Sequence, residues 1–268
     1  MDGNASVALD PASSNGCFET MRAYAGRIFR LDEHLERLYA SAASLGTRLS
    51  SNRREVAEQL TSALTASGLR EAVVRVAFLP HGATSNRAQA YIVVQPMQAI
   101  PASLYQKGIR VAVVPSRKFS VGSIDPQAKY SARLGSVLAV IDAQLHGVDE
   151  ALFMDETSSV TESTASNFGI VSRRVVCTPP CWLGLLAGIT RDILFELADE
   201  LQLRVREAPL TRHELYNADE AFLLSTLKEV LPVTTIDGRR IGTGRPGPVA
   251  RQLGAAFRRL VRRELHIN

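Results

Sequence analysis

The feature that most constrains the fold is the segment from Ser116 to Gln127, in which hydrophobic residues follow neither helical nor strand spacing. It separates two regions in which such spacing is strong. Turn-forming residues without a helical or strand period are typical of a segment that connects packed units. We therefore expect a small N-terminal α+β domain over residues 1–115, a linker over 116–127 and a larger C-terminal domain over 128–268. The chain has 268 residues, 46% of them hydrophobic, which is enough for substantial buried cores.

The N-terminal region alternates between strand and helix patterns. The pattern predicts a hairpin of two strands, Phe18 to Tyr24 and Arg27 to Phe29, that turns at Ala25-Gly26. Asp32 is expected to cap a helix that ends at Gly46, and a second amphipathic helix is expected from Asn52 to Ala66. Three runs rich in strand-forming residues follow, at Ala72–Leu79, Ala90–Gln95 and Ile109–Val114.

The C-terminal region is also mixed. It opens with a helical pattern of apolar residues between Leu134 and Leu145, and a further helix is expected from Arg191 to Gln202. Short strands are expected at Glu150–Met154, Phe168–Val171, Val175–Thr178 and Ala221–Ser225, before a last helix. Strands and helices in both regions place the chain in the α+β class.

Charge and cysteine content favour an ordinary globular protein. The net charge is +4, but four arginines, Arg258, Arg259, Arg262 and Arg263, share a helical segment with regularly spaced apolar residues, so we interpret them as a solvated helix face. The three cysteines cannot all pair, and the spacing of Cys177 and Cys181 without a histidine pair argues against zinc. We expect a cytoplasmic protein without a metal, because neither a signal peptide nor a membrane-spanning stretch is recognisable.

Two residues in the C-terminal region are candidates for chemistry. Lys129 stands immediately before a helix, where its amine can reach into a cleft, and Glu162 stands among small polar residues that leave room for a bound group. Each has an ordinary alternative as a surface lysine or a turn glutamate. Together, an amine for an aldehyde and a carboxylate for a ring nitrogen are what pyridoxal phosphate needs from a protein.

A third block suggests an anion site. Gly188-Ile189-Thr190 precedes a helix, so the amides of Ile189 and Thr190 would lie at the positive end of its dipole, although Thr190 could also be a simple helix cap. Thr226 follows a predicted strand and could add a hydroxyl. Arg37 could supply a positive charge if its helix borders the cleft, or it could be a helix-surface charge.

The order of these blocks resembles the class IV aminotransferases, the fold-type IV pyridoxal-phosphate enzymes that include branched-chain aminotransferases, D-amino-acid aminotransferases and aminodeoxychorismate lyases. The resemblance runs from Cys17 over nearly the whole chain. It rests on the segments Gly16–Arg22, Glu33–Leu38, Lys129–Leu134, Glu162–Asn167, Gly188–Asp192, Ala218–Glu220 and Ile236–Gly238.

The resemblance implies a two-domain fold, with a smaller α/β sandwich domain and a larger domain that has a β-barrel-like core flanked by helices. It implies that Lys129 is the catalytic residue that joins pyridoxal 5′-phosphate through a carbon–nitrogen double bond and then carries a proton. Glu162 is implied to bind the ring nitrogen. Arg37, Ile189, Thr190 and Thr226 are implied to hold the phosphate. A homodimer is also implied.

Three residues are expected at the substrate. Phe18 and Leu227 are apolar. Lys228 stands where the resemblance implies a small residue, and it would crowd or recharge the region that is implied to receive the substrate carboxylate. The leading hypothesis is a transaminase for a branched-chain or other hydrophobic amino acid and a 2-oxo acid. The alternatives are an aminodeoxychorismate lyase that releases pyruvate and forms 4-aminobenzoate, and an inactive relative that serves as a binding or dimerisation module.

Overall fold

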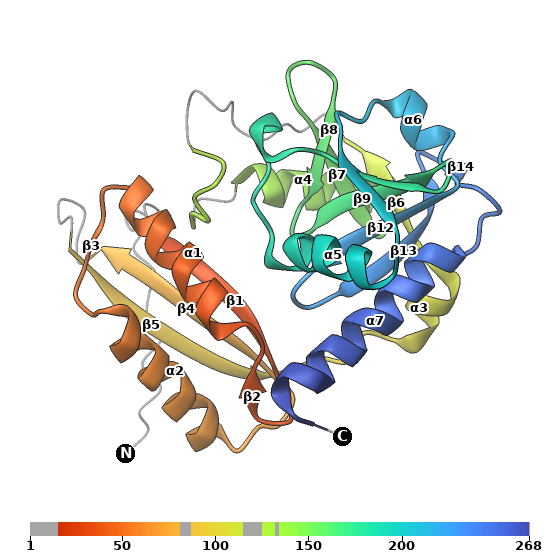
Figure 1. Cartoon of the computed structure of the whole chain (residues 1–268). Coiled ribbons are helices and arrows are strands. Elements are labelled where there is room, and N and C mark those ends of the chain that lie inside the picture. The colour runs from red at the N-terminus through yellow and green to blue at the C-terminus, as the bar shows by residue number, and fades with distance from the viewer. Residues whose placement is uncertain (1–15, 81–86, 115–124, 132–133, 268) are drawn as a thin grey trace.

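Two sheets organise the molecule (Figure 1). The computed structural model describes residues 16–80, 87–114, 125–131 and 134–267. Most of the predicted linker, residues 116–124, lies outside the described residues. The first sheet uses strands from the N-terminal region, and the second uses strands from residue 109 onward.

The first sheet has five strands in the order β2-β1-β4-β5-β3, and two helices cover one of its faces. The core between them is apolar and includes Met21 on the sheet, Leu38 on the first helix and Leu60 on the second. The elements are β1 (Cys17–Tyr24), β2 (Arg27–Ile28), α1 (Leu31–Ser44), β3 (Arg48–Leu49), α2 (Arg53–Ser67), β4 (Ala72–Pro80) and β5 (Arg87–Pro96).

The ends of the two helices have different causes. Asn52 caps α2 through a reciprocal pair of bonds with Glu55, and Gly68 ends it with a positive φ of 68°. The predicted cap of α1 is wrong, because Arg30 stands at the cap position with φ 53°. Asp32 instead lies in the first turn, where its charge is favoured by the helix dipole.

The second sheet forms a closed barrel. Its order is β11-β10-β9-β12-β13-β6-β7-β8, and a further pairing of β8 with β9 joins six of these strands into a ring. The strands are β6 (Ile109–Val113), β7 (Glu150–Met154), β8 (Val160–Ser163), β9 (Asn167–Ser172), β10 (Val175–Thr178), β11 (Arg204–Glu207), β12 (Glu220–Ser225), β13 (Glu229–Ile236) and β14 (Arg239–Arg240). The predicted barrel-like core is therefore confirmed.

Helices flank this barrel on two sides. The helices are α3 (Ala102–Lys107), α4 (Leu134–Leu145), α5 (Ile189–Glu200), α6 (Arg212–Tyr216) and α7 (Pro248–Leu265). Helices α5 and α7 pack with strands β9 to β13 in one apolar cluster, and α4 packs through Ala139 and Ala143 on β6 and β7 in another. The arginines of α7 are exposed while Leu253, Phe257 and Leu260 are buried, which confirms the solvated helix face.

One strand lies on the other side of the expected boundary. Strand β6 was expected in the N-terminal domain but pairs with β7 and β13 of the barrel. We therefore propose that the units divide between β5 and β6. Arg30 joins them, because its guanidinium bonds Glu196 of α5 at 2.7 Å and Glu264 of α7 at 2.6 Å. In the described part of the chain, no helix is long and apolar enough to cross a membrane.

Candidate active site

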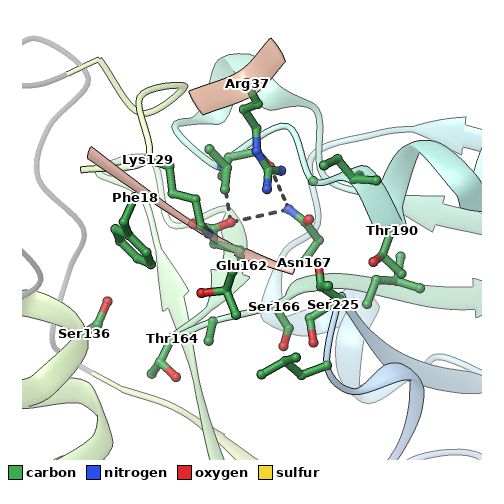
Figure 2. Close-up of a pocket in the computed structure, with 18 of the residues that line it drawn as sticks. Phe18, Arg37, Lys129, Ser136, Glu162, Thr164, Ser166, Asn167, Thr190 and Ser225 are labelled. Carbon is green, nitrogen blue, oxygen red and sulfur yellow. Dashed lines mark hydrogen bonds between the residues drawn. The ribbon is translucent and has the colours of Figure 1, made fainter. Parts of the chain in front are cut away.

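A cavity of about 250 Å³ lies between the two units, and every site residue that the sequence predicts lines it. Strand β1 contributes because its side chains alternate, so that Met21 enters the first core while Phe18 and Thr20 face the cavity. Figure 2 shows the labelled side chains of both units converging on this space. The predicted residues at the cavity are Phe18, Arg37, Lys129, Glu162, Ile189, Thr190, Thr226, Leu227 and Lys228.

The backbone around Lys129 is held by the first unit. Its N–H donates to Ser41 Oγ of α1 at 3.0 Å, and its carbonyl accepts from the Phe18 amide of β1 at 3.0 Å. The ammonium lies 5.2 Å from the centroid of the Phe18 ring. Lys129 therefore reaches the cavity from a short segment that is fixed at both of its peptide groups.

Glu162 is buried in the cavity wall, where β8 pairs with β9. Its Oε2 accepts from Asn167 Nδ2 at 3.4 Å and from the Leu186 amide at 3.2 Å. The Asn167 amide group also donates to the Leu186 carbonyl at 2.9 Å, which orients it (Figure 2). The carboxylate is thus held in one position, and Asn167 is a supporting residue to which the sequence analysis gave no role.

A buried carboxylate orients Arg37. Its Nε and Nη2 donate to the two oxygens of Glu19 at 2.6 and 2.9 Å, and its Nη1 donates to the Ala187 carbonyl at 2.7 Å. Burial favours a higher pKa for Glu19, but the adjacent Arg37 and the bond from His34 hold that pKa far below its usual range. Glu19 is therefore ionised, and the alternative of Arg37 as a simple helix-surface charge does not describe this geometry.

His34 completes this cluster from α1. Its Nδ1 lies 2.8 Å from Glu19 Oε2, and burial lowers its pKa against the attraction of the carboxylate. The ring is then neutral at physiological pH, and we assign the proton to Nδ1, because Glu19 can only accept. Neither Glu19 nor His34 was assigned a role from sequence, although both stand in quoted segments.

The start of α5 faces the same cavity. Gly188, and not Thr190, is the cap residue, so Ile189 and Thr190 are the first two helical residues and their N–H groups have no acceptor within the helix. A Cβ on Gly188 would lie 1.9 Å from Asn167 Oδ1, so glycine is needed for this close approach. The helix N-terminus is therefore seated directly against the support of Glu162.

The turn between β12 and β13 forms another part of the wall and carries Thr226, Leu227 and Lys228. Arg22 of the first unit donates to the Leu227 carbonyl at 3.4 Å and to Glu229 at 2.9 Å. Lys228 Nζ donates to Glu150 at 2.6 Å. Arg75 also lines the cavity but was not predicted; its place opposite Thr20 in the β1–β4 pair could have indicated it.

The family model described as amino-transferase class IV matches residues 16–236. The chain belongs to the class IV aminotransferases. A putative branched-chain-amino-acid aminotransferase of Methanocaldococcus jannaschii is 37% identical over 252 residues, covering 91% of this chain and 86% of the relative. A D-alanine aminotransferase of Bacillus licheniformis is 32% identical over 250 residues, covering 91% and 86%.

Solved structures agree in fold. The Escherichia coli branched-chain amino acid aminotransferase has a TM-score of 0.89 and 31% identity, covering 95% of this chain and 87% of that one. The Thermobaculum terrenum branched-chain enzyme in its pyridoxal-phosphate form has a TM-score of 0.86 and 29% identity, covering 93% and 86%. The chain is thus an enzyme of this class, whose reaction moves an amino group between amino acids and 2-oxo acids with pyridoxal 5′-phosphate.

The cavity of this class IV aminotransferase fits the cofactor. Ser166 Oγ, on the cavity wall, is buried without a hydrogen-bond partner among the described residues. An unpartnered buried hydroxyl indicates a missing polar group. The donors of Arg37 and the α5 N-terminus suit a phosphate, and the fixed carboxylate of Glu162 suits a protonated ring nitrogen.

Proposed function

We propose that the protein transfers the amino group of a branched-chain or other hydrophobic amino acid to a 2-oxo acid. The observation that carries the proposal is the convergence of Lys129, Glu162 and the start of α5 on one cavity. Phe18 and Leu227 line the same space and favour an apolar substrate side chain. The branched-chain relatives, at 30% identity or more, support the same substrate class.

Each residue receives a role from its surroundings. Arg37, the amides of Ile189 and Thr190, and the Thr226 hydroxyl are suited to the phosphate, and Ser166 supplies a further donor nearby. Glu162 is suited to keep the pyridine nitrogen protonated, because Asn167 and Leu186 hold its carboxylate in place.

When bound, the cofactor supplies a carbonyl carbon that accepts an amine and a ring that withdraws electrons. Lys129 supplies the protein's amine for that carbon. Once displaced by the substrate amine, it serves as the base and then the acid that moves the proton from the substrate α-carbon. Phe18 packs at the ammonium and limits the space available to water there.

A half-reaction tests the proposal. Protein loaded with pyridoxal 5′-phosphate is expected to lose its near-visible absorbance band when L-leucine is added and to regain it with a 2-oxo acid. D-alanine replaces L-leucine in a parallel arm, because a D-alanine aminotransferase is among the relatives. Pyruvate release from aminodeoxychorismate without amino transfer would identify a lyase. A loaded protein that responds to none of these substrates would support the inactive module.

We further infer a homodimer that pairs through α4. Large apolar residues follow helical spacing on this helix and are exposed, at 65% for Leu134, 54% for Val137, 48% for Leu138, 45% for Ile141 and 80% for Leu145. An exposed apolar stripe of this kind is typical of an interface, and a two-fold axis would place the stripe against its own copy. Because α4 follows Lys129 closely, such a partner would lie near the cavity.

The molar mass of the protein, measured by light scattering as it elutes from a size-exclusion column, tests the proposed dimer. Val137→Glu places a charge on the stripe and is expected to shift the dimer to monomer. Gln144→Glu adds the same charge at an exposed polar position of the same helix and is the matched control. A monomeric wild-type protein, or two variants with the same mass, would overturn the assignment of α4 to the interface.

A further inference from the structure

Lys228 is a charged residue in a cavity where Phe18 and Leu227 present apolar groups to a substrate. It lines the cavity beside Leu227. Its ammonium donates to Glu150 Oε2 at 2.6 Å, and its side chain is 29% exposed while that of Glu150 is 6% exposed. The ion pair therefore lies at the wall, with the lysine on the cavity side and the carboxylate behind it.

Glu150 has partners for both of its oxygens. Oε1 accepts from Thr164 Oγ1 at 2.6 Å and from the Ala151 amide at 3.1 Å, and Oε2 accepts from Lys228. Thr164 is itself a cavity residue. A carboxylate that accepts from three donors is held in one position. Glu150 can therefore hold the Lys228 ammonium at the wall without using all three N–H groups of that ammonium.

The backbone of Lys228 is also fixed. Its N–H donates to Ser225 Oγ at 3.2 Å, and its carbonyl accepts from Tyr105 OH at 3.1 Å. Among the residues that the structure describes, the ammonium bonds to Glu150 alone. An ammonium has three N–H groups, so this arrangement leaves donors for a ligand in the cavity.

A second cation faces the same part of the cavity. Arg75 of β4 pairs with Thr20 of β1, so both side chains project from the same face of the sheet. Arg22 lies two residues further along β1 on that face, and it bonds the Leu227 carbonyl. Arg75 therefore faces the same cavity as Leu227 and Lys228. In the described part of the chain its guanidinium makes no ion pair.

We infer that Lys228, supported by Glu150 and Thr164, is a specificity-determining residue that binds the distal carboxylate of a dicarboxylic substrate. This inference rests on the proposed transamination and names the class of its second substrate. With a hydrophobic side chain in place, Glu150 compensates the Lys228 ammonium, so neither charge of this pair is left alone. With a dicarboxylic acid, the ammonium keeps Glu150 and bonds the incoming carboxylate as well. One compartment thus accepts both partners of the reaction.

Acceptor selectivity of the holoenzyme tests the inference. Lys228→Met is expected to lower kcat/KM for 2-oxoglutarate by roughly 10- to 100-fold relative to 4-methyl-2-oxopentanoate, because a hydrogen bond between two charged groups is lost. Lys228→Arg is expected to keep most of the preference. Lys107→Met, at an exposed lysine on α3, is the matched control and is expected to leave kcat/KM unchanged for both acceptors.

A purely structural role for the ion pair predicts a different pattern. If Lys228 only holds the turn, Lys228→Met lowers kcat/KM equally for both acceptors, or for neither, and the inference is overturned. Calorimetric titration of the holoenzyme with glutarate and with 4-methylvalerate gives a second measurement that needs no turnover. Lys228→Met should weaken the binding of glutarate and leave the binding of 4-methylvalerate unchanged. If the wild-type protein fails to transaminate but binds glutarate through Lys228, the proposed function fails while the carboxylate site stands.

Discussion

The two ends of the cavity are built differently. At the cofactor end, the two charged side chains proposed for the phosphate and the ring nitrogen are each bonded to a buried partner: Arg37 to Glu19, and Glu162 to Asn167. At the substrate end, Arg75 is exposed, and Lys228 is partly exposed and has a buried counter-charge in Glu150. This difference fits their tasks, because the cofactor site holds one group throughout the reaction whereas the substrate site must accept two different acids.

The largest expected effect lies between the two ends, at Lys129. Lys129→Ala is expected to lower the transamination rate by about 10³-fold or more, because both the covalent attachment and the proton carrier are lost. Absorbance should show loss of the band of the attached cofactor, while the phosphate and ring contacts still retain the cofactor on gel filtration. Methylamine should restore part of the rate. A variant that also loses the bound cofactor would show that the cofactor end depends on Lys129.

The next effect tests whether the cofactor end is as tightly packed as its contacts indicate. Gly188→Ala places a Cβ 1.9 Å from Asn167 Oδ1, so the amide that supports Glu162 must move. We expect cofactor affinity to fall by roughly 10-fold or more, as for loss of a supporting residue at a bound group. Gly254→Ala is the control, because its nearest neighbour would be 3.8 Å away. Equal cofactor dissociation constants for the two variants would contradict this packing.

Sequence patterns predicted residues that line the cavity, but not the residues that support them. Lys129, Glu162 and Thr190 stand in short local motifs, and helix periodicity placed α1 and α5 to within a few residues. The partners that hold them come from distant segments: Ser41 for Lys129, Leu186 for Glu162, and Ala187 for Arg37. Such contacts depend on tertiary packing, which local propensity does not encode.

The substrate end shows the same limit more strongly. Arg75 reaches the cavity only because β4 pairs with β1 in a particular register, and a shift of one residue would turn it to the other face. Strand β6 was misassigned for a related reason, because its parallel partners β7 and β13 lie far along the chain. Glu150 was predicted only as the start of a strand, and its ion pair with Lys228 was not foreseen.

The cofactor end should also set the acid stability of the fold. Burial lowers the pKa of His34 in the native protein below the ordinary histidine value near 6.5. When the pH falls below that ordinary value, His34 of the unfolded chain binds a proton that the native ring does not bind. Stability then falls as the pH drops, by at most about 1.4 kcal/mol per pH unit for one group. Glu19 has a depressed pKa in the native protein, so it adds a second loss of stability when the pH falls below the ordinary glutamate pKa near 4.5.

Urea unfolding between pH 7.5 and 4 measures this dependence. His34→Gln keeps an N–H donor for Glu19 but cannot titrate, so its stability should be flat between pH 7.5 and 5 where the wild-type value declines. His266→Gln, at the exposed C-terminal cap of α7, should keep the wild-type slope. The same slope in both variants would mean that His34 does not control this step.

The smallest effect sharpens the view of the substrate end. Thr164→Val removes one of the three donors to Glu150 with little change in shape. Glu150 then depends more on Lys228, which leaves the ammonium less available to a substrate carboxylate. We expect kcat/KM for 2-oxoglutarate to fall by roughly 3- to 10-fold, in line with about 1 kcal/mol for one hydrogen bond. The value for 4-methyl-2-oxopentanoate should be nearly unchanged, because an apolar side chain does not use the ammonium. A larger loss for the apolar acceptor would place Thr164 in the general packing of the cavity and would separate it from the Lys228–Glu150 pair.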